Sequence, residues 1–518
     1  MRVKQALGVL RALGVLLAIW SVLFAVAMVA RVIPEFADEV ESDGEVRPAP
    51  VAPDGGTRRA GSPTRPAKAR AAGARAEPGT TAAAVPAPAP PEPLPSEAAT
   101  RFTVCDAAVR MPAIGAVHVV GSPSPELAIG CGGVVHLVAA EQDDGALRPA
   151  RVVTFDAQAR DEATGAPPPQ SASSGTLEAG SLAAGDVDGD SLPDLVLPFW
   201  NAATDGSARG GRVYLVRREA SGAFGDPRLL APIAAVDVAL AQLDARPGLD
   251  IVALNRGSEL ARRPSEVWVF AGGPAPVRTA VLRSGIGGRS IEVADLDRDT
   301  HVDVVLVTKD DARVDVFYGD GTGRFPRSAT LNVEGVAEAF VADLDGDGHA
   351  ELLVGGRGLH LVTSGAAGAL EAQPIDAPAG LSDLAVADID SDGERDVIGL
   401  SAGVLVALLQ AEPTTFREAR LATFERVTSR TSEETDAAGT PPTALRTTRQ
   451  SLAAHRVAIA DLDGDGTLDA AVLVRSGGAT AAWELVLLPD IRRARNVELR
   501  GEPARLRDAP LVLHVSLG

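Results

Sequence analysis

A nine-residue acidic segment recurs beyond residue 100 of this 518-residue chain, and it constrains the fold more than any other feature. Each complete copy carries carboxylates at positions 1, 3, 5 and 9 and lies between two short apolar runs. The five complete copies are Asp186–Asp194 (DVDGDSLPD), Asp295–Asp303 (DLDRDTHVD), Asp343–Glu351 (DLDGDGHAE), Asp388–Asp396 (DIDSDGERD) and Asp461–Asp469 (DLDGDGTLD). With decayed copies at Gln242–Asp250 and His118–Glu126, the chain has seven units whose starts lie 45 to 73 residues apart.

An apolar run follows each acidic segment, then a polar or glycine-containing turn and a second apolar run, as in Val304–Val307 and Arg313–Tyr318. Short strands with frequent turns and no helical period predict an all-β fold. A repeat of about 50 residues with about four strands is typical of β-propeller blades, whose closed ring leaves only short strand edges unpaired. Seven units predict a seven-bladed β-propeller, and because two units are degenerate, six and eight blades stay open as alternatives.

The acidic segments need a positive partner. Carboxylates within a few ångströms of one another repel by roughly 1 to 4 kcal/mol per pair, depending on the local dielectric. Ca²⁺ tolerates six to eight oxygen ligands in irregular geometry, whereas Mg²⁺ requires a tight octahedron. Glycine at position 6 (Gly348, Gly393, Gly466) allows the sharp turn that directs the position-7 carbonyl inward. Ser191 and Thr300 replace this glycine, so we expect weaker sites there.

Two alternatives to a calcium loop of this kind can be weighed on the sequence. An EF-hand needs a bidentate Glu at position 12, which is occupied here by Leu197, Leu306, Val354, Gly399 and Val472. The segments could also be hairpin turns without an ion, since Asp and Gly favour turns, but five equivalent copies argue against that reading. The decayed copy at 242–250 has Arg at position 5, and we expect its guanidinium to replace the metal.

These units resemble FG-GAP/VCBS-type repeats, the calcium-loop blades also found in the integrin α-subunit propeller. Val316–Phe325 (VFYGDGTGRF) is similar to the strand and turn that end a VCBS-type unit. The resemblance covers residues 101–518 and implies about five Ca²⁺ sites, with side chains at positions 1, 3, 5 and 9 and the carbonyl at position 7 as ligands. Glu351 departs from the usual Asp at position 9. The implied ligand residues are Asp186, Asp188, Asp190, Leu192, Asp194; Asp295, Asp297, Asp299, His301, Asp303; Asp343, Asp345, Asp347, His349, Glu351; Asp388, Asp390, Asp392, Glu394, Asp396; and Asp461, Asp463, Asp465, Thr467, Asp469.

The net charge, the single Gly-x-Ser-x-Gly motif and the two cysteines limit the classes of function that the chain can have. With 49 Lys and Arg against 69 Asp and Glu, the formal net charge is −20, so we expect no nucleic-acid partner. The sole Gly-x-Ser-x-Gly, Gly399–Gly403, lies between two strands rather than before a helix, so it does not predict a nucleophile. We identify no catalytic residue and predict no enzymatic activity.

Cys105 and Cys131 flank the first unit, and in an exported domain we expect a disulfide between them.

The N-terminal part of the chain predicts export. Residues 1–11 carry three basic side chains, and Ala12–Ala30 is an uncharged apolar stretch of 19 residues, long enough for one transmembrane helix. A cleaved signal peptide is the alternative. Residues 31–100 form a Pro/Ala-rich linker that cannot bury a core, which leaves 101–518 as the propeller outside the cytoplasmic membrane, periplasmic or at the cell surface, or else secreted.

The leading functional prediction is a membrane-anchored, extracytoplasmic calcium-binding propeller that serves as a protein interaction, scaffold or adhesion module. Recognition of a polysaccharide is the alternative, with Trp200 as the best candidate for stacking on a sugar. A hydrolase or lyase is a lesser alternative. Two polar insertions, near residues 156–175 and 425–450, are predicted to be binding loops or disordered segments.

Overall fold

The computed structural model describes residues 99–516, apart from 111, 120–123, 158–175, 203–207, 259–260, 345, 365–368, 413–414, 432–444, 476–480, 501–502, 507–508 and 510. The predicted membrane segment and the linker up to residue 98 lie outside this set, as do Asp345 and most of the insertion near 156–175. None of the described residues belongs to a helix with the length and hydropathy of a membrane span. One short 3₁₀ helix, η2 (Ile491–Arg493), accompanies 32 strands in the described chain.

Three sheets consist of four consecutive antiparallel strands each. The first contains β11 (Ala235–Ala241), β12 (Asp250–Asn255), β13 (Glu266–Ala271) and β14 (Val277–Arg283); the second contains β15 (Gly288–Ala294), β16 (Asp303–Thr308), β17 (Arg313–Tyr318) and β18 (Arg327–Asn332); the third contains β19 (Glu338–Ala342), β20 (Glu351–Gly355), β21 (Leu359–Ser364) and β22 (Leu370–Ile375). Each sheet is thus a simple up-and-down meander, which confirms the expected repeat unit.

The remaining sheets elaborate the same unit. In one, β6 (Thr176–Ala179) and β7 (Ala183–Gly185) both pair with β8 (Asp194–Ala202), followed by β9 (Ala208–Val216) and β10 (Arg228–Ala231). Another contains β2 (Ala113–Val117), β3 (Glu126–Cys131), β4 (Val134–Asp143), β5 (Ala146–Asp156) and β32 (Leu511–Ser516). The last, ten-stranded sheet contains β23 (Ser382–Ala387), β24 (Asp396–Ser401), β25 (Val404–Glu412), β26 (Thr415–Thr431), β27 (Leu445–Ala460), β28 (Asp469–Arg475), β29 (Trp483–Leu488), β1 (Thr100–Cys105) and β31 (Ala504–Arg505), with β30 (Asn496–Arg500) on β26.

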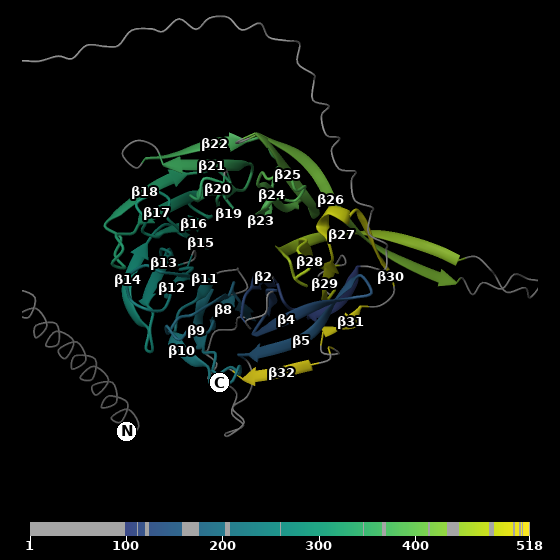
Figure 1. The fold of residues 1–518 in the computed structure, drawn as a ribbon, viewed down its shortest axis with the longest axis horizontal. Helices are drawn as coiled ribbons and strands as arrows, with labels where there is room; N and C mark the ends of the chain where they lie inside the picture. The colour runs from purple at the N-terminus through teal and green to yellow at the C-terminus, as the bar shows by residue number, and fades with distance from the viewer. Residues whose placement is uncertain are drawn as a thin grey trace, which may run out of the picture. The chain divides into compact units, whose positions relative to one another are not determined.

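The sheets are arranged around a central axis, which makes this part of the chain a β-propeller (Figure 1). The first strand of each unit lies innermost, because β11 contacts β8 and β15, and β15 contacts β19. The second strands are buried along almost their whole length, as β16 shows, because a neighbouring sheet covers each face. Between two sheets, Val305 and Val316 pack with Leu352 and Val354. Burial of each such side chain contributes about 1.5–3 kcal/mol, so the core lies between the sheets.

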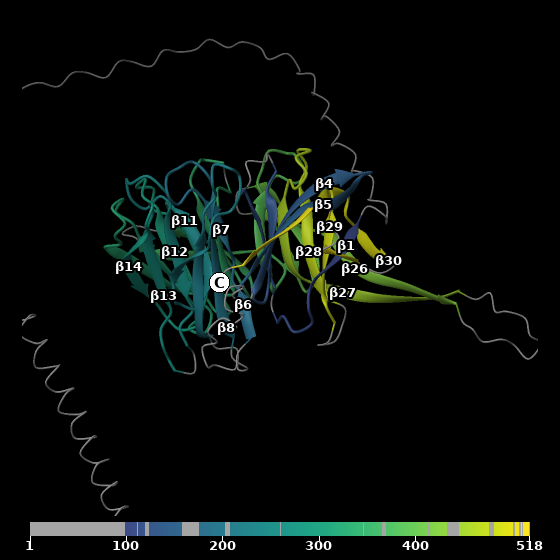
Figure 2. The same ribbon diagram turned by 90° about the horizontal axis from the view of Figure 1, so that it is seen from below.

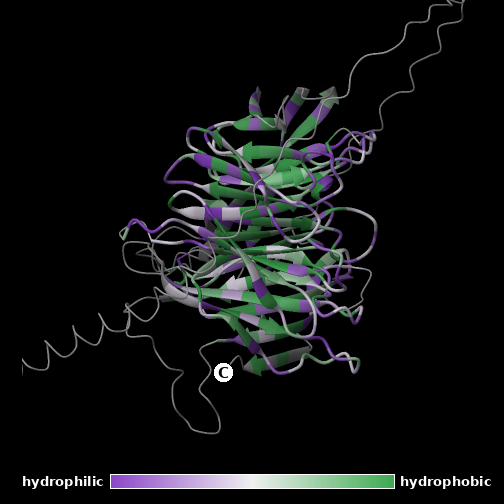
Figure 3. Cartoon of the chain, turned by 90° about the vertical axis from the view of Figure 1, so that its left-hand side faces the viewer, coloured by the Kyte–Doolittle hydropathy of each residue, from purple (hydrophilic) through white to green (hydrophobic). Residues whose placement is uncertain are grey.

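Side-chain polarity follows this arrangement. Figure 3 shows hydrophobic residues concentrated on the strands and many hydrophilic residues in the connecting loops. The outermost strands are largely exposed, as in β14, where Val277 is 63% exposed. The inner and middle strands therefore carry the apolar runs that the sequence shows most clearly.

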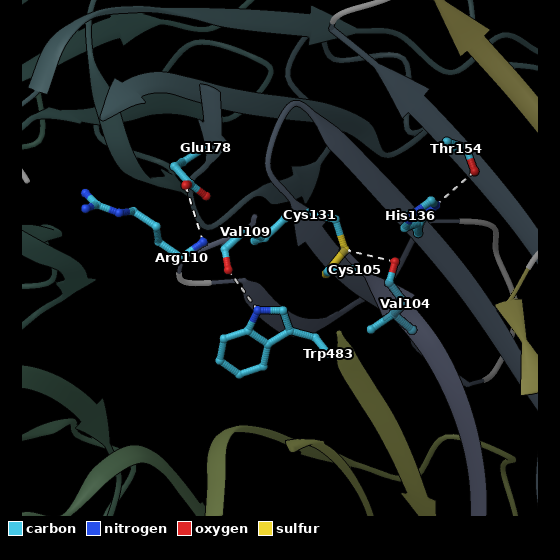
Figure 4. The surroundings of a disulfide bond; sticks show 9 residues. All are labelled: Val104, Cys105, Val109, Arg110, Cys131, His136, Thr154, Glu178 and Trp483. Carbon is cyan, nitrogen blue, oxygen red and sulfur yellow. Dashed lines mark hydrogen bonds between the residues drawn. A yellow bond between two sulfur atoms is a disulfide. The ribbon is translucent and has the colours of Figure 1, made fainter. Parts of the chain in front are cut away.

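The two ends of the described chain close the ring. β1, the first described strand, pairs antiparallel with β29 and so completes the last unit. β32, the last strand, pairs parallel with β5 of the first unit. The disulfide between Cys105 at the end of β1 and Cys131 at the end of β3 joins the last unit to the first (Figure 4). Beside it, the Trp483 indole N–H donates to the Val109 carbonyl at 2.9 Å.

The insertion near 425–450 is partly strand, which differs from the expected loop or disordered segment. β26 and β27 extend beyond the ring as a two-stranded ribbon (Figure 2). Their register pairs Phe424 with Leu452 and Thr431 with Leu445, and residues 432–444 lie outside the described residues. The threonine-rich composition that suggested a loop also favours strands, because β-branched side chains fit a pleated surface.

Candidate metal centres

All the acidic segments occupy one position in the architecture. Each connects the first strand of its unit to the second, as 295–303 connects β15 to β16 and 388–396 connects β23 to β24. The decayed segments do the same, with 242–250 between β11 and β12 and 118–126 between β2 and β3. Because every unit has the same strand order around the axis, these loops all lie on one face of the ring.

The first carboxylate of each loop organises the turn. In the last loop, Asp461 Oδ1 accepts the Gly464 N–H at 2.8 Å and Oδ2 accepts the Gly466 N–H at 3.0 Å. The carboxylate at position 5 then accepts the N–H of position 7, as Asp465 Oδ1 does from Thr467 at 2.7 Å. The same position-5 hydrogen bond occurs in all five complete loops. The chain therefore curls around its own carboxylates, which brings their oxygens together.

The ninth residue connects the loop to the rest of its unit. Asp469 Oδ2 accepts the N–H of Leu462 at position 2, and Oδ1 accepts the N–H of Asp490, which follows the third strand. Equivalent pairs of backbone hydrogen bonds hold Asp194, Asp250, Asp303 and Asp396. Glu351 accepts the position-2 N–H in the same way, as does Glu126 in the first decayed loop. Position 9 is thus a structural acceptor in every loop, and its remaining lone pairs can still face an ion.

Several carboxylate oxygens of the loops are buried without a hydrogen-bond partner in the described chain. Asp188 Oδ1, Asp297 Oδ1 and Asp463 Oδ2, all at position 3, are buried and accept no hydrogen bond from any described residue, and Asp343 Oδ1 is in the same state. Carboxylate oxygens from four loops converge within 4.8 Å of one another: Asp186, Asp188 and Asp194; Asp295, Asp297 and Asp299; Asp388, Asp390 and Asp396; Asp461, Asp463 and Asp465. Buried oxygens without donors fit a hard cation such as Ca²⁺, which binds oxygen ligands alone.

Burial raises the pKa of these carboxyl groups. It raises the pKa of Asp194 and of Asp303 to about 6 and that of Asp469 to about 7, with nearby loop aspartates adding to the rise. The pKa values of Asp188, Asp390 and Asp463 are also raised, first by burial. A bound divalent cation would oppose this effect, because its charge favours the ionised carboxylates.

The five complete loops differ in whether an arginine side chain forms an ion pair with one of their carboxylates. Arg217 forms an ion pair with Asp188 at 3.1 Å, Arg327 pairs with Asp297, and Arg298 reaches Asp347 of the neighbouring loop at 3.1 Å. No described Arg or Lys pairs with a carboxylate of the loops 388–396 and 461–469. Without such an ion pair among the described residues, the carboxylates of these two loops fit a divalent cation best.

The decayed loop at 242–250 carries its own replacement for the ion. The Arg246 Nε donates to Asp244 Oδ2 at 2.9 Å, as the sequence predicted for a guanidinium at position 5. The Gln242 amide donates to the carbonyls of Asp244 and Arg246 at 2.6 and 2.7 Å. Donors therefore occupy the space that an ion would need, and this loop is a natural comparison for the complete ones.

Backbone strain marks two positions per loop rather than one. Position 6 has positive φ in every complete loop, including Thr300 at 73° and Ser191 at 69°. Position 4 does so as well, with Arg298 and Ser391 both at 63° where the other three loops have glycine. Only position 6 was expected to need this conformation, although Gly189, Gly346 and Gly464 indicate position 4 in the same way. A β-branched residue such as Thr300 is strained in this conformation.

Ser401 is the last residue of β24 and precedes the hairpin turn to β25. Its hydroxyl donates to the Ala379 carbonyl at 3.2 Å, and Ser401 pairs with Val404 across the turn. Ala402 and Gly403 have φ of 49° and 80°, typical of a two-residue hairpin loop. The strand-to-helix geometry of a nucleophile elbow is therefore not present at this serine.

Comparisons with known proteins agree with the repeat pattern. Residues 179–216 match the FG-GAP repeat and residues 295–354 match the FG-GAP-like repeat. No curated protein matches the chain. Among solved structures, an Agrocybe aegerita lectin that recognises non-reducing terminal N-acetylglucosamine is 18% identical, with a TM-score of 0.41, over 74% of this chain and 94% of its own. The Dos1 propeller is 9% identical (TM-score 0.39, 80% and 98% covered), and the exotype rhamnogalacturonan lyase YesX is 14% identical (TM-score 0.32, 78% and 92% covered).

Proposed function

We propose, on the premise that this chain is an FG-GAP repeat protein, that residues 101–518 form a seven-bladed β-propeller stiffened by Ca²⁺ and used as a binding module. The blade number follows from division of the ten-stranded sheet at the β26–β27 ribbon. One half is then β23 to β26, and the other is β27, β28, β29 and β1. Together with the five smaller sheets, these halves complete a ring of seven.

The observation that carries the calcium proposal is the set of buried carboxylate oxygens at position 3 without hydrogen-bond donors. Calcium would supply the missing positive charge. The chain's own residues do the rest: position 1 shapes the turn, position 5 orients the position-7 backbone, and position 9 fixes the loop to the end of the third strand. A filled loop therefore stiffens the connection between the inner strand and the rest of its blade.

Ion analysis and thermal unfolding of the full chain test this directly. We expect about five Ca²⁺ per chain after dialysis in excess Ca²⁺, and a melting temperature that falls on chelation with EDTA and recovers when Ca²⁺, but not Mg²⁺, is restored. A chain that holds no calcium and melts at one temperature with and without EDTA would contradict the proposal.

The module is proposed to be non-enzymatic and to act outside the cytoplasmic membrane. The apolar stretch Ala12–Ala30 and the basic residues before it support export, as does a disulfide, which persists in oxidising compartments. Whether the apolar stretch is retained can be measured by partitioning of the expressed chain between membrane and soluble fractions, with protease added to intact spheroplasts. Propeller residues digested from outside fit the proposal, and complete protection would contradict it.

The binding partner is proposed to be a protein recognised by the rigid ring, in a scaffold or adhesion role. Capture of a defined partner by the full chain in Ca²⁺, lost in EDTA, is the expected result. The polysaccharide alternative is favoured by one observation: Trp200 is only partly buried and lines the central cavity of the ring, with the Arg256 guanidinium 5.6 Å from the ring centroid. Retention on glycan surfaces that is abolished by Trp200→Ala would favour that alternative.

A further inference from the structure

The axis of the ring contains a cavity of about 740 Å³, which the acidic loops do not line. Its walls are the inner strands of the blades, and this volume falls in the range of roughly 300–1,000 Å³ typical of small-molecule sites. The residue five positions before each acidic segment faces the cavity, and these residues are Ala113, Ser181, Asp237, Ser290, Glu338, Asp383 and Arg456. Six of these seven residues are polar or charged, and they include both acidic and basic side chains. A channel without a ligand would need only small or apolar residues at these positions.

The side chain of Arg289, which lines this cavity, indicates that the cavity binds a ligand. It is half-buried on β15, and no described residue makes a hydrogen bond or ion pair with its guanidinium. Arg456, by contrast, is paired with Asp383 at 3.1 Å. Burial lowers the pKa of Arg289 and Arg456 adds to this effect, while Glu338 and Asp383 oppose it without cancelling it, so the cation gains from a further anionic partner. A guanidinium of this kind matches a carboxylate through two parallel hydrogen bonds.

Unpartnered acceptors surround the same space. Glu178 is 3% exposed and its Oε2 has no hydrogen-bond partner among the described residues, while Oε1 receives only the Arg110 N–H at 3.5 Å (Figure 4). Glu338 Oε1 and Ser290 Oγ are also buried atoms with no such partner in the described chain. Burial raises the pKa of Glu178 and of Glu338 to about 7, so each exchanges a proton readily near neutrality. Groups like these complement hydroxyls, which both donate and accept.

The position of these groups separates them from the calcium loops. Arg289 lies six residues before Asp295 on an extended inner strand, about 20 Å from the acidic loop. Trp200, at the far end of β8, pairs in register with Glu178, so the aromatic ring and the buried carboxyl belong to the same end of the ring. A partly buried indole offers an apolar face and completes a mixed polar and aromatic lining.

We propose that the mouth of the central cavity, on the side opposite the acidic loops, binds an acidic saccharide. Arg289 pairs with the sugar carboxylate, and Glu178, Ser290 and Glu338 bind its hydroxyls. A uronic-acid unit presents one carboxylate and several hydroxyls on one compact ring, which matches one unpaired guanidinium beside several unpaired acceptors. A divalent ion fits less well, because the described carboxyls of this cavity do not converge as the loop carboxyls do.

Calorimetric titration of the full chain with uronic-acid trimers tests the proposal. The panel is galacturonate, glucuronate and mannuronate trimers, with the corresponding neutral trimers as matched ligands, in fixed free Ca²⁺. We expect submillimolar binding of at least one uronate and at least about tenfold weaker binding of its neutral counterpart, the loss that removal of one charged pair gives. Failure of every uronate to bind, or equal binding of the neutral sugar, would overturn the proposal.

Variants locate the site. Arg289→Gln is expected to weaken uronate binding about tenfold or more and to leave the neutral sugar within about twofold. Arg228→Gln is the matched control, because Arg228 is exposed on the outermost strand β10 and loses the same charge far from the cavity. Ser290→Ala, a change small enough to preserve folding, should weaken both ligands. Uronate affinity that is unchanged in both Arg289→Gln and Ser290→Ala would also overturn the proposal. So would tighter binding of free amino acids than of any uronate trimer in the same calorimetric titration.

The inference goes beyond the proposed binding module and fails separately from it. Loss of the calcium sites would appear as no melting shift with EDTA, whereas uronate binding reports only on the cavity. A chain that binds calcium and no uronate would refute the inference alone. A chain that binds uronate and no calcium would refute the stiffening proposal alone.

Discussion

Single residues in the loops set how well each can accept an ion. Positions 4 and 6 need positive φ, and glycine adopts it without strain. Where another residue occupies one of these positions, the positive φ destabilises that loop relative to the loops that have glycine there. The arginines add a second difference, because they neutralise carboxylates in three loops and leave the loops 388–396 and 461–469 without one.

Thr300→Gly tests the strain at position 6. With φ of 73° at a β-branched residue, the change should increase the free energy of unfolding by about 1 kcal/mol and strengthen calcium binding by the loop at 295–303. Denaturant unfolding and calcium titration measure the two effects. Thr300→Ala is the control, since it removes the side chain and keeps a Cβ in the strained conformation. Equal gains from Gly and Ala would show that the backbone is not the cause.

At the scale of the element, the loop joins the inner strand to the hairpin that follows. The carboxylate at position 9 does this in complete and decayed loops alike, because its oxygens accept backbone N–H groups from two segments. Position 3 has no such role, and in three of the complete loops it has a buried oxygen without a hydrogen-bond partner among the described residues, which fits a bound ion. Removal of calcium by a chelator should therefore change the stability effect of a substitution at position 3 but not that of a substitution at position 9.

Asp250→Ala and Asp463→Ala separate structural from metal-dependent carboxylates. Asp250 lies in the decayed loop and accepts N–H groups from Leu243 and Gly272, so its loss should cost about 2–4 kcal/mol of unfolding free energy with or without calcium. Asp463→Ala should destabilise the chain in Ca²⁺ only and lower the calcium content by one ion. Unfolding in Ca²⁺ and in EDTA gives both numbers. An Asp463→Ala variant that loses as much stability in EDTA as in Ca²⁺ would contradict this assignment.

The second and third strands of most blades could be located from the sequence, because an acidic segment marks where each second strand begins. The expected runs Val304–Val307 and Arg313–Tyr318 match β16 and β17, since one carboxylate pattern precedes each second strand. The ribbon β26–β27 was not predicted, because its pairing follows no repeated loop. The arginine partners of Asp188 and Asp297 were also missed, since Arg217 and Arg327 lie about 30 residues later and meet the loops only in the folded blade.

At the scale of the molecule, pairings between distant parts of the sequence close the ring. β1 joins β29 across almost the whole described chain, and β32 joins β5. Sequence periodicity predicts blades but not which strand completes the last one, since closure depends on two ends that share no local pattern. The cavity was missed for a similar reason: its polar lining is assembled from residues of all the blades, and these residues differ in type from one blade to the next.

The disulfide between Cys105 and Cys131 reinforces this closure. It connects residues 26 apart in sequence but in the last and first blades, so its loss should lower the free energy of unfolding by about 3 kcal/mol. The measurement is denaturant unfolding of a chain carrying Cys105→Ser and Cys131→Ser. Dithiothreitol should destabilise the natural chain by a similar amount and leave the double variant unchanged. A double variant as stable as the natural chain would show that the strand pairings alone close the ring.

The summed carboxylates make stability depend on pH, with a sign set by calcium. In the folded chain, burial raises the pKa of Asp469 to about 7 and those of Asp194 and Asp303 to about 6, above the ordinary value near 4. The folded state therefore binds more protons than the unfolded chain between about pH 4 and pH 7, and without calcium its stability must fall as pH rises through that window. In excess Ca²⁺ the ionised carboxylates gain a partner, so stability should instead hold or rise over the same range. In EDTA the melting temperature should be several degrees higher at pH 5 than at pH 7.5, and in Ca²⁺ this difference should disappear or reverse. The same pH dependence in both buffers would mean that the loop carboxylates do not bind the ion.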